Sequence, residues 1–165
     1  MGHFAVFKKY VPCEEMEINW HTRRLEEMKP LALHEMLALR QAVFIVEQYC
    51  PYPDADDQDL ISWHLLGYAQ EKLVAYTRLL PPGSSYENEI SLGRVLTHES
   101  TRGKGLGKVL MQKAIAECRK LFGSLPIRIS AQSYLHEFYR ELGFVATGKN
   151  YLEDGIPHIE MLKKD

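Results

Sequence analysis

The stretch that decides the fold is SLGRVLTHESTRGKGLGKVLMQKAIAECRKLF, which runs from Ser91 to Phe122. Its first residues form an apolar run that predicts a strand ending at Thr97. A glycine-rich segment follows. After it, apolar residues recur at three- and four-residue steps, which predicts an amphipathic helix. The glycine-rich segment therefore lies at a helix N-terminus, where free backbone N–H groups and the positive end of the helix dipole attract an anion.

The composition of this segment supports anion binding. Gly103, Gly105 and Gly107 carry no side chains that would keep a phosphate away from the backbone N–H groups. Arg102 and Lys104 add cationic donors. Glycine lowers helix stability, so this density of glycine beside two cations indicates a binding function rather than a neutral helix end. The sequence predicts a site for a diphosphate or a similar anion.

Two common nucleotide-binding motifs do not fit the segment. A Walker A loop needs Gly at position 102 and Ser or Thr at position 109, where Arg102 and Val109 stand. A dinucleotide fingerprint needs Gly at position 108, where Lys108 stands. The predicted anion site is therefore of a different kind.

A family resemblance accounts for the loop. The run Arg102-Gly103-Lys104-Gly105-Leu106-Gly107 resembles the Arg/Gln-x-x-Gly-x-Gly/Ala loop of the GNAT superfamily of N-acetyltransferases. Downstream, FYRELGF at 138–144 resembles the family's Tyr-x-x-x-Gly-Phe segment. Three further stretches resemble the ElaA-type branch: VFIVEQ at 43–48, AQSYL at 131–135 and EDGIPHI at 153–159. The resemblance spans about residues 17 to 163, with its motifs in the family's order.

This resemblance implies an enzyme that transfers acetyl from acetyl-CoA to a primary amine by direct attack in a ternary complex. The acceptor would be a small molecule or a peptide or lysine amine. The glycine-rich loop would bind the pyrophosphate, and the backbone of the preceding strand would hydrogen-bond the pantetheine arm and polarise the thioester carbonyl. Gln132 stands where many relatives carry a pantetheine-binding Asn. The implied acetyl-CoA-binding residues are Val95, Leu96, Thr97, Arg102, Gly103, Lys104, Gly105, Leu106, Gly107, Lys108 and Gln132.

The catalytic residues are less completely specified. By family position Tyr139 is the general acid for the departing thiolate, although its helical spacing also fits an aromatic core residue. Glu47 is the predicted general base, with His64, Glu99, the aspartates at 54–59 and a water relay left open. A non-catalytic acyl-CoA-binding regulatory module is the alternative function, and Tyr139 argues against it.

Two arginines stand in apolar strand sequences. Arg78 and Arg94 would be costly there without partners, so they either line the acceptor pocket or form structural ion pairs.

The remaining periodicities place strands and helices along the chain. Helices are predicted over 30–44, 106–122 and 133–142, and strands over 17–22, 62–70, 72–80, 89–97, 126–131, 144–151 and 156–162. The order β-α-β-β-β-α-β-α-β-β predicts an α/β fold with a mixed, largely antiparallel central sheet flanked by helices, as the GNAT resemblance also implies. Residues 1–15 fit poorly and are predicted to be an N-terminal extension to a single domain over 16–165.

Composition bounds the class of protein. The 165 residues are 45% apolar and 25% charged, as expected for a globular chain, and the net charge of −2 argues against a general nucleic-acid binder. No apolar run reaches the length of a membrane span, no secretory signal is evident, and no His or Cys spacing is typical of a metal site. We expect a cytoplasmic enzyme without a metal, nucleic-acid or membrane partner, and family habit favours a homodimer.

Overall fold

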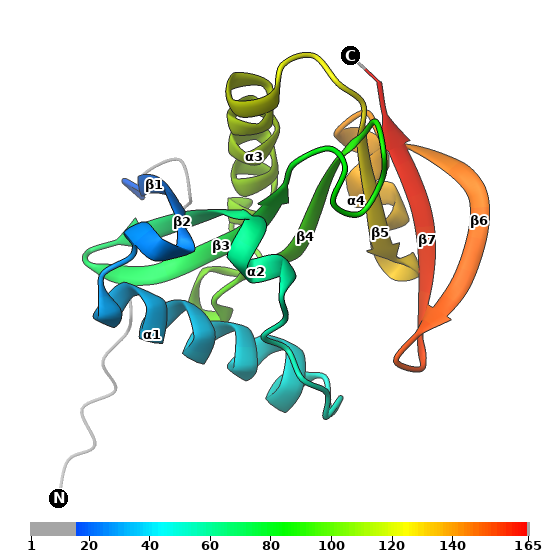
Figure 1. Ribbon diagram of the computed structural model, residues 1–165. Helices are drawn as coiled ribbons and strands as arrows, with labels where there is room; N and C mark the ends of the chain where they lie inside the picture. Colours follow the sequence, from blue (N-terminus) through cyan, green and yellow to red (C-terminus); the bar gives the residue numbers. More distant parts are fainter. Residues whose placement is uncertain (1–15, 165) are drawn as a thin grey trace, which may run out of the picture.

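A seven-stranded sheet with helices on both faces organises the computed structural model, which describes residues 16–164 (Figure 1). The strand order is β1-β2-β3-β4-β5-β7-β6. Neighbouring strands are antiparallel except β4 and β5, which are parallel. The predicted α/β fold with a mixed, largely antiparallel sheet is confirmed. The predicted extension 1–15 lies outside the described residues. Within the described part of the chain, no helix is long and apolar enough to cross a membrane.

The elements follow the predicted order closely. The strands are β1 (Asn19–Arg24), β2 (Trp63–Ala69), β3 (Lys72–Leu80), β4 (Ile90–Thr97), β5 (Ile127–Gln132), β6 (Val145–Glu153) and β7 (Ile156–Lys163). The helices are α1 (Pro30–Arg40), α2 (Gln58–Ile61), α3 (Leu106–Phe122) and α4 (His136–Glu141).

Three helical details differ from the sequence prediction. The helix expected over 30–44 ends as α-helix at Arg40 and continues as a π-helical segment over Gln41–Glu47. The four-residue helix α2 was not predicted, because it is too short to show a period and is held by tertiary contacts of Asp59. The helix expected over 133–142 is a 3₁₀ turn, Ser133–Leu135, followed by α4.

Both faces of the central strands are buried. Side chains alternate across a strand, so adjacent Leu65 and Leu66 of β2 point to opposite faces. Leu65 joins the larger core beneath α3, which includes Leu110 and Ala114 of that helix. Leu66 joins a smaller core with residues of α1, among them Met36. Helix α3 therefore covers one face of the sheet and α1 the other (Figure 1).

The two parallel strands diverge soon after they meet. β4 and β5 pair only where Ile90 lies opposite Ile127 and Ser91 opposite Arg128. Beyond this point β4 continues beside β3 as far as Thr97, while β5 pairs with β7. The divergence leaves the β5-facing edge of β4 open along most of its length, and this opening is where the candidate site lies.

Candidate active site

A cavity of about 820 Å³ occupies the opening between β4 and β5. Its walls come from the second half of β4, the end of β5, helix α4, the π-helical segment and the β6–β7 hairpin. Most of these walls contain a motif that the sequence singled out, although the motifs are far apart along the chain. The fold therefore gathers them around one space.

The glycine-rich loop lies at the start of α3, as predicted. Helix α3 begins at Leu106, and Gly105 caps it with a φ of 85°. Gly103 has a φ of 71°, and a Cβ built on Gly103 or Gly105 would have no neighbour within 4 Å. Positive φ favours glycine at both positions, and the open space leaves the backbone accessible. These features fit a diphosphate.

The cations beside the loop have partners in the protein. Nη1 of Arg102 lies 2.7 Å from Oε2 of Glu47, and its Nε donates to the carbonyl of Thr97 at 3.2 Å. Nζ of Lys104 donates to the carbonyl of Ser100 at 3.0 Å. The Arg102–Glu47 pair is partly exposed, so it is weak enough to exchange partners when an anion arrives.

The residues predicted to hold pantetheine face one another across the opening. Leu96 and Thr97 of β4 pair with β3 on one side, and they line the cavity together with Val95. Gln132 lies at the end of β5 and also lines the cavity. Its Nε2 donates to Oε1 of Gln48 at 3.2 Å, which links β5 to the end of the π-helical segment.

Tyr139, the predicted general acid, is both an aromatic residue of the core and a residue of the cavity wall. Its ring packs edge-on against Phe138 and Phe144, and only 6% of the residue is exposed. It also lines the cavity. Burial raises the pKa of the Tyr139 phenol well above its usual value, so the hydroxyl keeps its proton near neutral pH. The geometry is compatible with a proton donor that is also a core residue.

The residues considered as general base fall in different places. Glu47 lines the cavity but pairs with Arg102. His64 is fully buried, with Nδ1 2.8 Å from the hydroxyl of Tyr76 and Nε2 3.0 Å from the carbonyl oxygen of Asp59. Burial lowers the pKa of His64. His64 is therefore a structural residue of the core.

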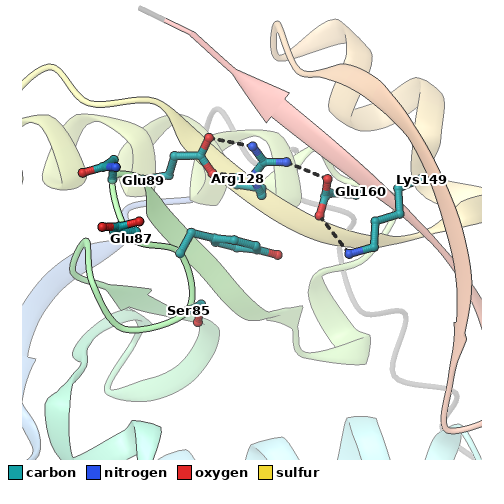
Figure 2. Close-up of a pocket in the computed structure, with 8 residues that line it drawn as sticks. Ser85, Glu87, Glu89, Arg128, Lys149 and Glu160 are labelled. Atoms are coloured by element: carbon teal, nitrogen blue, oxygen red, sulfur yellow. Dashed lines mark hydrogen bonds and ion pairs between the residues drawn. The ribbon is translucent and has the colours of Figure 1, made fainter.

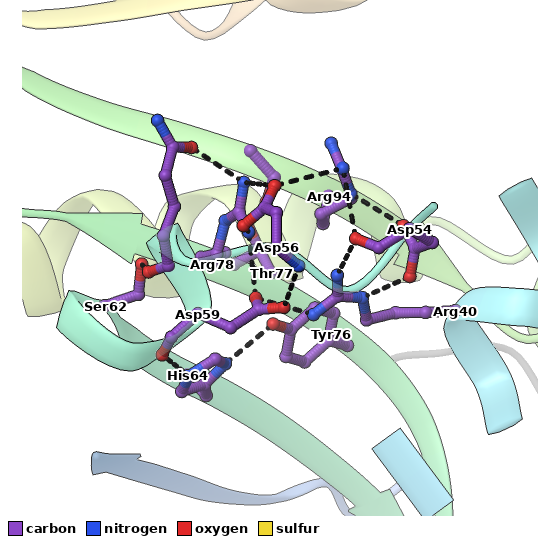
Figure 3. A network of polar contacts seen from close by, with 12 residues as sticks. Arg40, Asp54, Asp56, Asp59, Ser62, His64, Tyr76, Thr77, Arg78 and Arg94 are labelled. Carbon is purple, nitrogen blue, oxygen red and sulfur yellow. Dashed lines mark hydrogen bonds and ion pairs between the residues drawn. The ribbon is translucent and has the colours of Figure 1, made fainter. Parts of the chain in front are cut away.

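A network of arginines and aspartates explains the acidic loop (Figure 3). Arg40, fully buried, donates from Nε to Asp54 at 2.7 Å and from Nη1 to Asp59 at 2.7 Å. Arg78 bonds Asp56 at 2.6 Å and Asp59 at 2.8 Å, and Nε of Arg94 donates to Asp54 at 2.8 Å. Arg78 and Arg94 thus form the structural ion pairs that were one of their two predicted roles, and both also line the cavity.

The network holds the acidic loop against the sheet instead of leaving it solvated. Burial alone raises the pKa of Asp59, but hydrogen bonds and charge from Arg40 and Arg78 outweigh it, and the net pKa lies below its usual value. Sequence reasoning missed Arg40, because it stands on the apolar side of its helix. A charge on that face is itself the signal of a buried partner.

Comparison with known proteins identifies the family. Residues 59–164 match the family model of the acetyltransferase (GNAT) domain. The chain belongs to the GNAT acetyltransferase family. Its relatives include a UPF0039 protein of Synechocystis, 47% identical over 148 residues that cover 89% of this chain and 96% of that protein. Protein ElaA of Escherichia coli is 39% identical over 149 residues, which cover 89% of this chain and 97% of ElaA.

Solved structures agree with the sequence relatives. The crystal structure of Escherichia coli ElaA matches with a TM-score of 0.83 and 37% identity over 90% of this chain and 100% of that chain. An acyl-CoA N-acyltransferase from Pseudomonas aeruginosa matches with a TM-score of 0.84 and 38% identity over 89% of this chain and 99% of that chain. The chain is thus an acetyl-CoA-dependent acyltransferase of the ElaA-type GNAT branch.

The GNAT cavity has a further wall whose residues the sequence did not assign. His158 of β7, Tyr151 and Glu153 of β6, Ser130 of β5 and Cys50 all line it. Sγ of Cys50 lies 3.8 Å from the carbonyl oxygen of Asp154, which ties the segment after the π-helix to the β6–β7 turn. The EDGIPHI stretch resembled the family, but its chemistry depends on strands that only the fold brings together.

A smaller groove beside the GNAT cavity is occupied by paired charges (Figure 2). Arg128 of β5 bonds Glu89 through Nη2 at 2.6 Å and Glu160 through Nη1 at 2.6 Å. Lys149 lies 3.6 Å from Glu160. Glu89 ends the loop that follows β3, whose Ser85 and Tyr86 line the large cavity. These ion pairs therefore hold one wall of the large cavity in place.

Proposed function

We propose that this GNAT enzyme transfers the acetyl group of acetyl-CoA to a primary amine, of a small molecule or of a peptide or lysine residue. The transfer occurs by direct attack in a ternary complex. The observation that carries the proposal is the open edge of β4, which runs from the glycine-rich loop into a cavity bordered by Tyr139. One continuous surface thus joins an anion site to a proton donor.

The donor would lie along this surface. Backbone N–H groups at the start of α3, with Arg102, Lys104 and Lys108 nearby, favour the diphosphate. Arg102 would then exchange Glu47 for phosphate oxygens. The amide-rich pantetheine arm would pair with the free edge of β4 at Val95–Thr97, as an added strand does.

The reacting groups would meet in the middle of the cavity. A backbone N–H of β4 near Val95 polarises the thioester carbonyl, and Tyr139 supplies a proton to the sulfur as it leaves. Glu153 and Asp154 of the β6–β7 hairpin line the same cavity, and their negative charge attracts a cationic amine. A cationic amine is therefore the kind of acceptor that this wall favours.

Direct attack can be separated from an acetyl-cysteine route. Burial raises the pKa of the Cys118 thiol to about 12, and Cys118 lies in the core, so it is no nucleophile. Cys50 lines the cavity. After incubation with acetyl-CoA alone, we expect the intact mass of the protein to be unchanged and Cys50→Ser to retain activity. A stable acetyl adduct that requires Cys50, with parallel initial-velocity lines, would contradict direct attack.

The acceptor is found by screening for released thiol. The panel should hold free amino acids, a polyamine, an arylalkylamine, and peptides with a free α-amine or a lysine. Acetylated product, identified by mass, establishes the transfer. No product from any amine, despite bound acetyl-CoA, would count against the proposal. The homodimer and the cytoplasmic location stay predictions.

A further inference from the structure

His158 is a nearly buried side chain on the cavity wall. It lies on β7 and has 9% of its surface exposed. Nδ1 of its ring lies 2.8 Å from the carbonyl oxygen of Ile156. Since a carbonyl oxygen only accepts hydrogen bonds, Nδ1 carries the proton of the neutral ring and donates it. Nε2 is then the unprotonated nitrogen, with an available lone pair.

The Nε2 atom has no hydrogen-bond partner in the described residues and is not fully buried. No residue within 16–164 hydrogen-bonds Nε2 of His158. Nor is Nε2 sealed in the interior, because over the same residues Arg78 Nε is the only fully buried side-chain nitrogen or oxygen without a partner. Nε2 of His158 is therefore accessible, and the residue that carries it lines the cavity.

The ring is held in place by its neighbour on β6. Tyr151 stacks on His158 with ring centroids 6.1 Å apart and an angle of 19° between the planes. The Tyr151 hydroxyl donates to Oγ of Ser130 at 2.6 Å, and Ser130 donates to Glu153 at 2.9 Å. These contacts, with the bond to the Ile156 carbonyl, orient the imidazole. Such a fixed ring suits proton transfer.

The position of His158 along the strands places it beside the donor. Gln132 of β5, His158 of β7 and Tyr151 of β6 lie directly opposite one another, so their side chains share a face of the sheet. Gln132 is the proposed pantetheine contact, and Tyr139 lines the same cavity. A base at His158 and an acid at Tyr139 would thus flank the acetyl group.

Other titratable groups surround this face. Tyr151 and Glu153 face it from β6, and Arg128 of β5 pairs with Glu160, two residues along β7 from His158. Histidine is the side-chain type among them that ordinarily exchanges protons nearest neutral pH. Lys149 lies over the Tyr151 ring at 5.4 Å. The other charged or titratable residues that line the cavity are Glu47, Cys50, Tyr52, Arg78, Tyr86, Arg94, Arg102, Tyr134, Tyr139 and Asp154.

We propose that Nε2 of His158 is the general base of acetyl transfer, an inference that rests on the proposed function. The neutral amine gives an N–H proton to Nε2, directly or through one water, as its lone pair forms the C–N bond with the thioester carbonyl carbon. The C–S bond breaks and its electron pair stays on sulfur, which takes a proton from Tyr139. His158 then releases its proton to solvent, from which Tyr139 recovers one. The products are the acetamide and the coenzyme A thiol.

The test compares His158→Gln with His136→Gln. Gln keeps a polar side chain that cannot hold a proton, and His136 is a partly exposed residue of α4 that does not line the cavity. We expect His158→Gln to bind acetyl-CoA with unchanged Kd but to lose about 100-fold or more of kcat/KM, together with the acidic limb of the pH profile. Added imidazole should restore part of the activity of His158→Ala. His136→Gln should behave as wild type.

Two results would overturn the assignment. The first applies when the wild type is active: either the His158→Gln variant retains wild-type activity, or the acidic limb of its pH profile persists. The other needs no acceptor: long-range ¹H–¹⁵N NMR of the wild type should show His158 as the Nδ1–H tautomer, and a proton on Nε2 of the neutral ring would exclude this base. If no amine is acetylated, the proposed function fails, and the NMR result still decides whether His158 has the form a base requires.

Discussion

At the scale of single residues, Tyr139 carries the most specific chemical prediction. Replacing Tyr139 by Phe removes only the hydroxyl and keeps the edge-on contacts with Phe138 and Phe144. We expect stability and the Kd for acetyl-CoA to be unchanged, and kcat to fall by about 100-fold, because general acid catalysis typically contributes that much. Stopped-flow or steady-state release of thiol measures the change.

The control for this substitution is Tyr49→Phe. Tyr49 is 92% exposed and is not part of the cavity wall, so its hydroxyl has no expected role. Equal rates for Tyr139→Phe and wild type would show that a water, and not Tyr139, protonates the sulfur.

The residues that line the cavity differ in how well the sequence alone could single them out. Tyr139 and Gln132 line the cavity, and short motifs pointed to both positions because they fix the spacing of these residues from Gly143 and from each other. His158 could not, because its role depends on the carbonyl of Ile156 and the ring of Tyr151, which the β6–β7 hairpin brings to it. The sequence pattern marks strand residues, but it does not say which nitrogen of a histidine is free.

At the scale of elements, phosphate binding at the start of α3 can be tested by comparing substitutions at the two ends of this helix. Gly105 and Gly123 flank this helix with φ angles of 85° and 79°, and neither has an atom within 4 Å of a built Cβ. Glu meets backbone strain at both positions. The strain is about 1–2 kcal/mol at Gly105, whose ψ of −2° is left-handed, and larger at Gly123, whose ψ of −170° lies in a region essentially restricted to glycine. We expect Gly105→Glu to weaken acetyl-CoA binding by about 10- to 100-fold through repulsion of the diphosphate and loss of its N–H bonds.

Gly123→Glu is the control in that titration. Its carboxylate lies at the opposite end of the helix, so the Kd for acetyl-CoA should stay at the wild-type value even though this variant loses more stability than Gly105→Glu. Equal affinities for the two variants would mean that the loop before α3 does not hold the phosphates.

Regular elements were predictable and irregular ones were not. β3 has the bounds that its apolar run predicts, 72–80, because alternation and burial there agree. The π-helical turn over Gln41–Glu47 and the short helix α2 break any period. Both adjoin residues of the arginine–aspartate network, whose pairs join positions 14 to 40 residues apart. Local propensity carries no information about such pairs.

At the scale of the whole molecule, that network predicts how stability depends on pH. The folded pKa of Asp59 lies below its usual value of 3.8. The stability that this carboxylate contributes is therefore complete above that value and is lost as pH falls through the lower folded pKa. We expect Asp59→Asn to lower the free energy of unfolding by about 3 kcal/mol at neutral pH, since it leaves Arg40 and Arg78 without a full partner.

The comparison that checks this uses urea unfolding of Asp59→Asn and Asp57→Asn from pH 7.5 to pH 3. Asp57 is exposed, so its variant should follow wild type throughout. The deficit of Asp59→Asn should shrink below about pH 4, where wild type loses the same interaction. A deficit that is constant with pH would show that the carboxylate charge is not what the arginines require.

The central claim is that the opening between β4 and β5 takes acetyl-CoA, and calorimetric titration tests it most directly. The purified chain should be titrated with acetyl-CoA, with ATP and NAD as controls, in wild type, Gly105→Glu and Gly123→Glu. We predict micromolar binding of acetyl-CoA alone, weakened only in Gly105→Glu. Binding of ATP or NAD instead, or no binding of acetyl-CoA by folded wild-type protein, would contradict the account.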